Sequence, residues 1–348
     1  MNILSLHEKV WKQLVERRQQ LPHALLLTGQ RGIGKFDLAV HFVQWLLCEN
    51  STSSQEACGT CLSCGWLSQG NHPDFRLIQP ETLAGIQEET TENSSNKKAS
   101  QQITIDQIRA LDDFLHIGTH RMGLRIVLIN PAEAMNRSTA NSLLKSLEEP
   151  SVSTLFILVS SEYDRLLPTI RSRCQQLFVP IPEFGRSTAC LNTVGIKDAE
   201  HWLALTGSSP LRAAELASTD EHLVLDILVA ELTKGAGLNP FAAAVAIDRT
   251  IKAVKVSIPL KQWVEWGQKW LIDLILVRIG QNPRYFLTYE ETLHELVKTT
   301  NLEKLLAFFR KALQYRRQTE QPLNSRLFFE DFFLGYMTLF QPVKDGNA

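Results

Sequence analysis

The chain has 348 residues, of which 44% are hydrophobic and 21% charged, and its 36 basic side chains nearly balance its 37 acidic ones. This composition is that of an ordinary globular protein long enough for two or three domains, and it excludes a chain that is disordered throughout. A formal net charge of −1 argues against a basic, tail-driven nucleic-acid binder. No apolar run approaches the roughly 18 to 20 residues of a membrane helix, and the charged N-terminus lacks a signal-peptide block, so we expect a cytoplasmic protein.

The first half of the chain alternates short apolar runs with helical patterns. Five runs have the length and apolarity of strands buried on both faces: residues 24–28, 75–78, 126–129, 155–160 and 176–179. Helical periodicity fills three intervening segments: residues 34–47, 105–117 and 137–149. The second helix is preceded by Thr104-x-x-Gln107, a capping-box spacing. These patterns predict a doubly wound α/β domain that binds ligands at the carboxyl ends of its strands.

Two breaks in composition divide the chain. Residues 80–102 are polar and nearly free of large apolar side chains, which predicts a mobile surface loop. Near Pro180 two prolines end the last strand and the pattern turns to helix, which predicts a domain boundary. The helical part has three apolar stretches: residues 263–275, 291–317 and 324–340. The tryptophans of the first stretch either pack in a core or form a partner-binding surface.

A glycine-rich turn follows the first predicted strand. The segment GQRGIGK, which begins at Gly29, has the P-loop spacing G-x-x-x-x-G-K between a strand and a helix. Gly29, Gly32 and Gly34 let backbone N–H groups face a phosphate, and Lys35 adds a positive charge. Because the next position should carry a hydroxyl that holds Mg²⁺ and instead carries Phe36, a glycine-rich turn without bound nucleotide stays open as the alternative.

The strand predicted at 126–129 lacks the acidic residues that an ATPase needs at its end. An aspartate would hold the metal there and a glutamate would polarise the attacking water, but this chain has Asn130 and Pro131. Glu133 lies two residues further on, and we expect it not to reach the same place. We therefore predict that the chain alone does not hydrolyse ATP.

Four cysteines fall within seventeen residues, at Cys48, Cys58, Cys61 and Cys64. In a reducing compartment such a cluster indicates metal binding, and four thiolates favour a closed, structural zinc site. Reduced cysteines in a loop are the alternative, although that loop would then have no visible core. His72 is the rival fourth ligand, but His-Pro-Asp is more typical of a turn leading into a strand.

Two arginines, Arg171 and Arg173, stand just before the last predicted strand. By composition alone they would form surface salt bridges. An arginine at such a place can also enter a neighbouring subunit's nucleotide site, where it stabilises the γ-phosphate charge of the transition state.

Taken together, these motifs resemble the delta prime family of bacterial DNA polymerase III clamp-loader subunits, relatives of the AAA+ ATPases. The resemblance rests on the four-cysteine insert and five segments: HALLLTGQRGIGK, GNHPDF, ITIDQIR, ANSLLKSLEEP and IRSRC. It covers the first 180 residues or so closely. It continues more weakly through GSSPLR, which ends at Arg212 and is similar to the sensor 2 segment of the family's lid, and into residues 324–331.

The resemblance implies three domains. An α/β AAA+ P-loop domain, with its parallel sheet flanked by helices, is expected at residues 1–176. It carries the zinc insert at 48–64 and the mobile loop at 80–102. A small helical lid at 177–219 and an all-α collar at 220–348, through which five subunits assemble, complete the fold.

The resemblance also implies a role. Members of this family stand at one end of a five-subunit arc with the gamma or tau motor subunits and delta, and the arc uses ATP to load the ring-shaped beta clamp on primed DNA. They are described as rigid stators without ATPase activity of their own, whose SRC arginine, here Arg173, completes the neighbouring motor's nucleotide site. Since Gly34 and Lys35 are kept, whereas some members lack the P-loop, binding of ATP or ADP without turnover stays open.

Two other functions are the alternatives. A gamma- or tau-like motor subunit would require a hydroxyl at Phe36 and acidic residues at Asn130 and Pro131. A zinc-dependent DNA-binding module would be expected to carry a basic, aromatic stripe near the cysteines, which this sequence lacks.

Overall fold

The computed structural model describes residues 1–51, 56–84, 100–116, 123–254, 258–318 and 324–341. It divides into two compact units, Met1–Arg186 and Ser187–Ala348, and the division falls close to Pro180. The finer division into a lid at 177–219 and a collar at 220–348 stays a prediction. Among the described residues, no helix is both long and apolar enough to cross a membrane.

The first unit is built on a parallel sheet of five strands, in the order β2-β3-β4-β1-β5. The strands are β1 Ala24–Thr28, β2 Phe75–Ile78, β3 Arg125–Ile129, β4 Thr154–Ser160 and β5 Gln175–Phe178. Every strand predicted from the sequence is present, with starts within one residue. β1 lies between β4 and β5, so that Leu26 is paired with Leu158 on one side and Gln176 on the other.

The expectation that all five strands are buried on both faces is wrong for two of them. Every residue of β1, β3 and β4 is buried, whereas β2 and β5 each bury one residue and expose others. These two strands form the edges of the sheet. An edge strand has a neighbour on one side only, so fewer covering side chains reach it.

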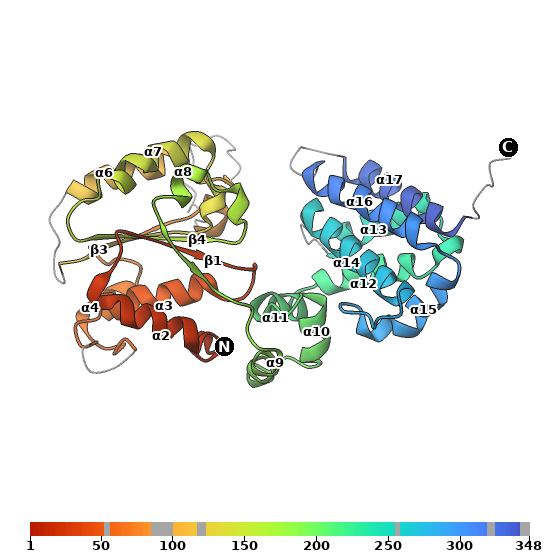
Figure 1. Ribbon diagram of the computed structural model, residues 1–348, viewed down its shortest axis with the longest axis horizontal. Helices are drawn as coiled ribbons and strands as arrows, with labels where there is room; N and C mark the ends of the chain where they lie inside the picture. Colours follow the sequence, from red (N-terminus) through yellow and green to blue (C-terminus); the bar gives the residue numbers. More distant parts are fainter. Residues whose placement is uncertain (52–55, 85–99, 117–122, 255–257, 319–323, 342–348) are drawn as a thin grey trace. The chain divides into compact units, whose positions relative to one another are not determined.

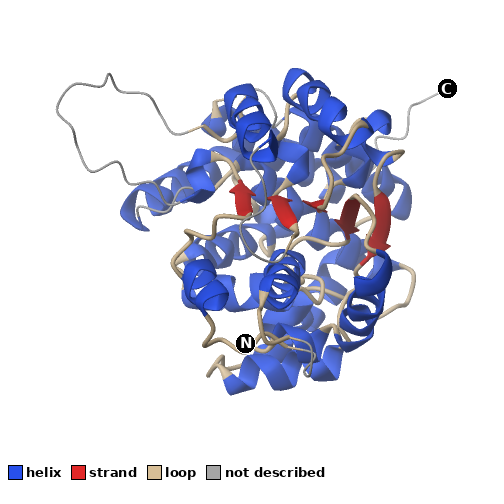
Figure 2. Ribbon diagram, turned by 90° about the vertical axis from the view of Figure 1, so that its left-hand side faces the viewer, coloured by secondary structure: helices blue, strands red, loops and turns tan. Residues whose placement is uncertain are grey.

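Helices cover both faces of the sheet, as Figure 1 and Figure 2 show. Helices α6 and α7 lie on one face, and α2 and α3 on the other (Figure 1). The α-helices of this unit are α1 Ile3–Leu6, α2 Glu8–Glu16, α3 Lys35–Leu47, α4 Leu62–Ser68, α5 Glu81–Ala84, α6 Ile105–His116, α7 Arg137–Glu148 and α8 Pro168–Arg171. Three short 3-10 helices join them: η1 Arg17–Gln20, η2 Ala132–Ala134 and η3 Tyr163–Arg165.

The predicted capping box begins α6. The backbone N–H of Thr104 donates to Gln107 Oε1 at 2.8 Å, and the N–H of Gln107 donates to Thr104 Oγ1 at 3.4 Å. The helix then buries Ile108 and Leu111 against the sheet in one cluster with Leu143 of α7. Helices α6 and α7 are thus fixed on the sheet by their apolar faces.

The loop predicted at 80–102 is described only at its two ends. Glu81–Ala84 forms α5, and the Glu81 carboxylate accepts the backbone N–H of Ser100 at 2.8 Å. Residues 85–99, on which most of that prediction falls, lie outside the described residues.

The second unit is helical, and its described residues contain no strand. Its α-helices are α9 Phe184–Thr193, α10 Ala199–Leu205, α11 Pro210–Ser218, α12 Glu221–Leu232, α13 Pro240–Val254, α14 Leu260–Arg278, α15 Glu290–Lys298, α16 Leu302–Gln318 and α17 Ser325–Met337. The 3-10 helices are η4 Gly235–Gly237, η5 Leu287–Tyr289 and η6 Thr338–Phe340. The helical stretch predicted at 291–317 is two helices, because Asn301 caps a new one by accepting the N–H of Lys304.

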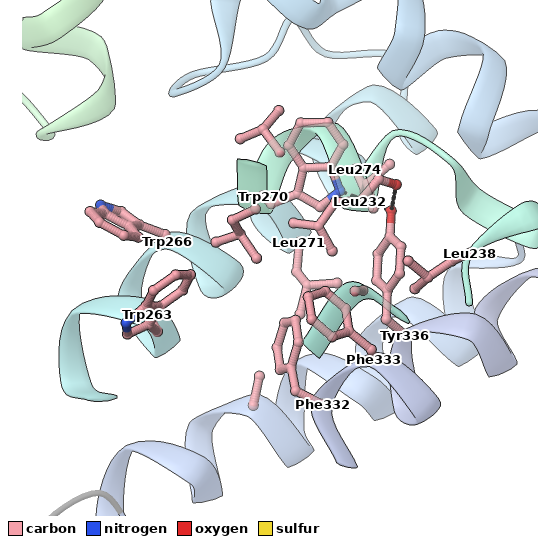
Figure 3. Close-up of a cluster of buried hydrophobic side chains, with 14 of the residues drawn as sticks. Leu232, Leu238, Trp263, Trp266, Trp270, Leu271, Leu274, Phe332, Phe333 and Tyr336 are labelled. Atoms are coloured by element: carbon pink, nitrogen blue, oxygen red, sulfur yellow. Dashed lines mark hydrogen bonds between the residues drawn. The ribbon is translucent and has the colours of Figure 1, made fainter. Parts of the chain in front are cut away.

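The tryptophans of α14 form part of the core, which excludes a free partner surface for them. Trp263, Trp266 and Trp270 are all buried in the apolar cluster drawn in Figure 3. The indole N–H of Trp270 donates to Tyr336 Oη at 2.9 Å, and that hydroxyl donates to Leu232 O at 2.9 Å. This chain of two bonds joins α14, α17 and α12 through buried polar groups.

Two helical glycines admit aromatic rings from neighbouring helices. A Cβ at Gly267 of α14 would lie 2.7 Å from the ring of Phe332 in α17, and one at Gly335 of α17 would lie 2.4 Å from the ring of Phe308 in α16. Neither position has room for a side chain. The three helices therefore pack through these glycines.

Candidate functional site

The glycine-rich turn between β1 and α3 has the backbone of a P-loop. Gly32 and Gly34 have φ angles of +78° and +93°, in the left-handed region that favours glycine. A Cβ at Gly29, where φ is +155°, would lie 2.4 Å from the carbonyl oxygen of Val179. The turn leads straight into α3, so its N–H groups and the helix N-terminus lie where a phosphate could bind.

Lys35 is folded into the turn instead of extending into solvent. Its side chain is buried, with 4% of the residue exposed. The Nζ donates to Gly29 O at 2.9 Å, Gln30 O at 2.6 Å and Ser161 Oγ at 2.9 Å. Burial lowers the pKa of Lys35 to about 8, although nearby Glu133 opposes the shift.

The expectation that Glu133 does not take the place of the acids missing after β3 stays a prediction, but the structure brings its carboxylate near the P-loop lysine. Glu133 lies in η2, and its Oε1 accepts the backbone N–H of Ser161 at 2.9 Å. Ser161 in turn accepts Lys35 Nζ, so the carboxylate is one residue removed from the P-loop lysine and raises its pKa. The turn through Pro131 and η2, which the local pattern does not encode, brings it there.

A second residue that sequence reasoning missed supports the turn from the other side. The Nε2–H of His7, between α1 and α2, donates to the carbonyl oxygen of Ile33 at 2.5 Å. The imidazole is buried, and burial lowers the pKa of His7, which favours the neutral ring. The contact spans 26 residues, and no local motif marks it.

The three residues that are expected to prevent ATP hydrolysis lie at the start of α3 and directly after β3. Phe36, half-buried in the first turn of α3, has no oxygen for a metal ion. Asn130 follows β3 directly, and its N–H donates to Ile78 O at 3.0 Å. Pro131 comes next, after a cis peptide bond, and has no acid or base. Phe36 and Pro131 thus offer no ligand to Mg²⁺ and no base to water.

The four predicted cysteines come together. The Sγ atoms of Cys48, Cys58, Cys61 and Cys64 all lie within 4.8 Å of one another. Sulfurs about 3.8 Å apart would surround a zinc ion tetrahedrally at the usual Zn–S distance of about 2.3 Å. Only a small inward movement would therefore close the site around zinc.

Backbone groups of the insert already favour thiolates. The N–H groups of Cys58, Cys61 and Cys64 donate to the sulfurs of Cys48, Cys58 and Cys61 at 3.2, 3.4 and 3.4 Å. Hydrogen bonds from the backbone of Thr60 and Cys61 lower the pKa of Cys58 to about 5, while burial raises the pKa of Cys64 to about 12. These N–H groups would also stabilise the charge of a zinc–thiolate cluster.

His72 is excluded as the rival ligand because both its ring nitrogens are used. Nδ1 accepts the N–H of Asp74 at 3.1 Å, which leaves Nε2–H to donate to Ser63 Oγ at 2.8 Å. The hydroxyl of Ser63 then donates to Leu47 O at 2.5 Å. This buried chain ties α4 of the insert to the end of α3, just before Cys48.

Arg173 lies at the end of the segment that follows α8. Its Nη1 donates to Thr169 O at 3.0 Å and to Ser172 Oγ at 3.4 Å, and its Nη2 lies 2.5 Å from Glu148 Oε1. One third of its side chain remains exposed. Arg171, the other arginine of the motif, instead lies with its guanidinium 4.7 Å from the ring centre of Tyr163.

Arg212, predicted to act as a sensor 2 arginine, belongs to the other unit. Its guanidinium pairs with Glu215 at 2.8 Å and with Glu221, which joins α11 to α12. Only 17% of the side chain is exposed. In this structure Arg212 thus joins two helices of its own unit. Its contact with a nucleotide, as a sensor 2 arginine, stays a prediction.

The sheet order and the P-loop after β1 place the first unit in the AAA+ class of P-loop α/β domains. The comparisons are more specific. The family described as "DNA polymerase III, delta subunit" matches residues 6–182. A DNA polymerase III subunit delta' from Pseudomonas aeruginosa is 34% identical over 323 residues, which cover 90% of this chain and 84% of that protein. The chain therefore belongs to the DNA polymerase III delta' family, as its motifs predict.

Other relatives and a solved structure match as well. The DNA polymerase III subunit delta' of Bacillus subtilis is 33% identical over 223 residues, which cover 62% of this chain and 61% of that protein. A crystal structure of a DNA polymerase III gamma subunit-related protein from Thermotoga maritima matches with a TM-score of 0.45 and 17% identity, over 95% of this chain and 99% of that one.

Proposed function

We propose that this chain is the stator subunit of a bacterial clamp loader. It would assemble with gamma or tau motor subunits and with delta into the five-subunit arc that loads the beta clamp on primed DNA. It would not turn over ATP itself, and would give Arg173 in trans to the neighbouring motor. Family membership supports the assembly, and the single observation that carries the stator role is a complete P-loop backbone next to Phe36, Asn130 and Pro131.

The absence of turnover is tested on the isolated chain. Without a hydroxyl at Phe36 and an acid at Asn130, neither Mg²⁺ nor the attacking water has its usual partner. We expect no ATP hydrolysis above background. A measurable rate that disappears in Lys35→Ala would instead support a motor subunit. Binding of ADP or ATP without turnover is compatible with the P-loop backbone and is measured separately by equilibrium dialysis.

The role of Arg173 is tested in the reconstituted complex with primed DNA and clamp. We expect Arg173→Ala to lower ATP hydrolysis at least tenfold while gel filtration shows an intact complex, since an arginine supplied in trans contributes about 10³ to 10⁵ in rate. Arg165→Ala is the matched control, because Arg165 is an exposed arginine of the same region that pairs with Glu162. If the rate in Arg173→Ala is unchanged, Arg173 does not act in trans, and this chain has only a structural role in the complex.

We also propose that the four cysteines hold a structural zinc ion. Cys48, Cys58, Cys61 and Cys64 would supply all four ligands, so that no position is open for catalysis. When bound, the ion would join the insert to the end of α3 and replace the apolar core that the insert lacks. We expect Cys61→Ser to lose the metal in elemental analysis, whereas Cys190→Ser, which changes a buried cysteine elsewhere, keeps it.

A further inference from the structure

The partner of Arg173 comes from a different helix. Glu148 is the last residue of α7, and its Oε1 lies 2.5 Å from Arg173 Nη2. The other two contacts of the guanidinium, with Thr169 and Ser172, come from its own segment. Among the described residues, Glu148 is therefore the ion-pair partner that joins Arg173 to another helix.

Both sides of this contact are anchored in the core. Leu147, beside Glu148, is 1% exposed, and Ile170, three residues before Arg173, is fully buried in the same apolar cluster. The backbones that carry the carboxylate and the guanidinium are thus fixed, while the two charged groups remain partly exposed, at 49% and 33%. An ion pair across fixed backbones limits the many rotamers that a free arginine would sample.

The contacts of Arg173 leave part of the guanidinium available. Nη1 donates to Thr169 O and Ser172 Oγ, and Nη2 lies beside Glu148 Oε1. Among the described residues, no hydrogen bond from Nε–H is found, and one third of the side chain is exposed. An exposed N–H of an arginine can donate to a phosphate oxygen.

We propose that Glu148 is a positioning residue for Arg173: it limits the orientations of the guanidinium, so that the exposed part of the group is already placed for a phosphate of the adjacent subunit. This inference rests on the proposed function, in which Arg173 acts in trans. Glu148 does not touch the nucleotide. It lowers the entropy that the arginine must lose when it enters the neighbouring site.

The test measures ATP hydrolysis by the complex reconstituted with primed DNA and clamp. For a pair this exposed we expect Glu148→Ala to lower kcat about two- to fivefold. The KM for ATP should stay within about twofold of the wild-type value, because the motor subunit makes the other contacts with the nucleotide. Glu148→Gln, which keeps an acceptor oxygen without the charge, should give a rate between those of Glu148→Ala and the wild type.

Two comparisons separate positioning from a general structural effect. Glu149→Ala changes the neighbouring exposed glutamate and should have the wild-type rate. In the double variant Glu148→Ala with Arg173→Ala, the rate should equal that of Arg173→Ala alone, because Glu148 then has nothing to position. The thermal midpoint of each variant and gel filtration of each complex confirm that fold and assembly are kept.

The outcomes distinguish this proposal from the function on which it rests. If Arg173→Ala slows hydrolysis but Glu148→Ala does not, or makes it faster, the positioning role is wrong and the trans arginine stands. Additive losses in the double variant would also overturn it, since Glu148 would then act through another group. If Arg173→Ala itself has no effect, the trans role fails and the positioning role fails with it.

Discussion

Replacement of Lys35 by methionine tests whether the P-loop lysine is as strongly desolvated as its surroundings indicate. Methionine has a similar length and shape but no charge, so the variant removes the ammonium group while it fills most of the same space. In the wild type, burial lowers the pKa of Lys35 to about 8, compared with 10.5 for the free side chain. The folded protein therefore releases this proton at a lower pH than the unfolded chain does.

The direction of the effect follows from proton linkage. Between about pH 8 and 10.5 the unfolded chain binds the Lys35 proton and the folded protein does not, so the free energy of unfolding rises with pH in this window. Relative to the methionine variant, the wild type should gain about 2 to 3 kcal/mol between pH 7 and pH 10. Below pH 8 the folded and the unfolded protein both hold the Lys35 proton, so the difference in stability between the wild type and Lys35→Met should no longer change with pH.

The measurement is urea unfolding of both proteins at half-unit steps from pH 7 to pH 10. The free energy of the variant is subtracted from that of the wild type at each pH, so that the titration of the cysteines and of all other groups cancels. Lys145→Met, at an exposed lysine of α7, is the matched control.

A flat difference between the wild type and Lys35→Met across this range would refute the reasoning. It would mean that water reaches the lysine and that its contacts with Gly29, Gln30 and Ser161 do not replace solvent in the folded protein. A difference that falls with pH would mean that the folded site favours the charged form.

Three further substitutions test the packing described above, by thermal or urea unfolding. Tyr336→Phe should lower the free energy of unfolding by about 1 to 3 kcal/mol, because the Trp270 indole N–H and the Leu232 carbonyl both lose the hydroxyl as a partner. A loss below about 0.5 kcal/mol would contradict this. Gly29→Ala should destabilise the first unit and weaken any nucleotide binding, since its Cβ would overlap the Val179 carbonyl; wild-type stability would show that the turn adapts. Leu143→Ala should cost about 2 to 5 kcal/mol, whereas Val152→Ala, at an 88% exposed position, should cost almost nothing, and equal losses would contradict the assigned core.

The strands and the P-loop helix could be predicted because their signals are local. Apolar runs of four to seven residues define each strand, and GQRGIGK contains its own strand, turn and helix start. Sheet order is different. The runs at β2 and β5 contain Arg76, Gln175 and Gln176 and are less apolar than the central ones, which is a local sign of exposure. Which strands lie side by side depends on the whole domain, and no single run encodes that.

The contacts around Lys35 could not be predicted for the same reason. Glu133 and Ser161 are 28 residues apart, and His7 reaches Ile33 across 26 residues. A glutamate four positions after the end of a strand gives no sign of where its carboxylate will lie. The break between α15 and α16 was predictable in principle, because Asn301 has the residue type of a helix N-cap.

Gly267 and Gly335 have a consequence for how the second unit tolerates sequence change. Each glycine lowers the intrinsic stability of its own helix by about 1 kcal/mol relative to alanine. In exchange, the rings of Phe332 and Phe308 occupy the space where a Cβ would stand, so each ring and its glycine form a complementary pair. Substitution at either glycine should be accepted only together with a smaller residue at its partner, and the two members of each pair should therefore change together among related sequences.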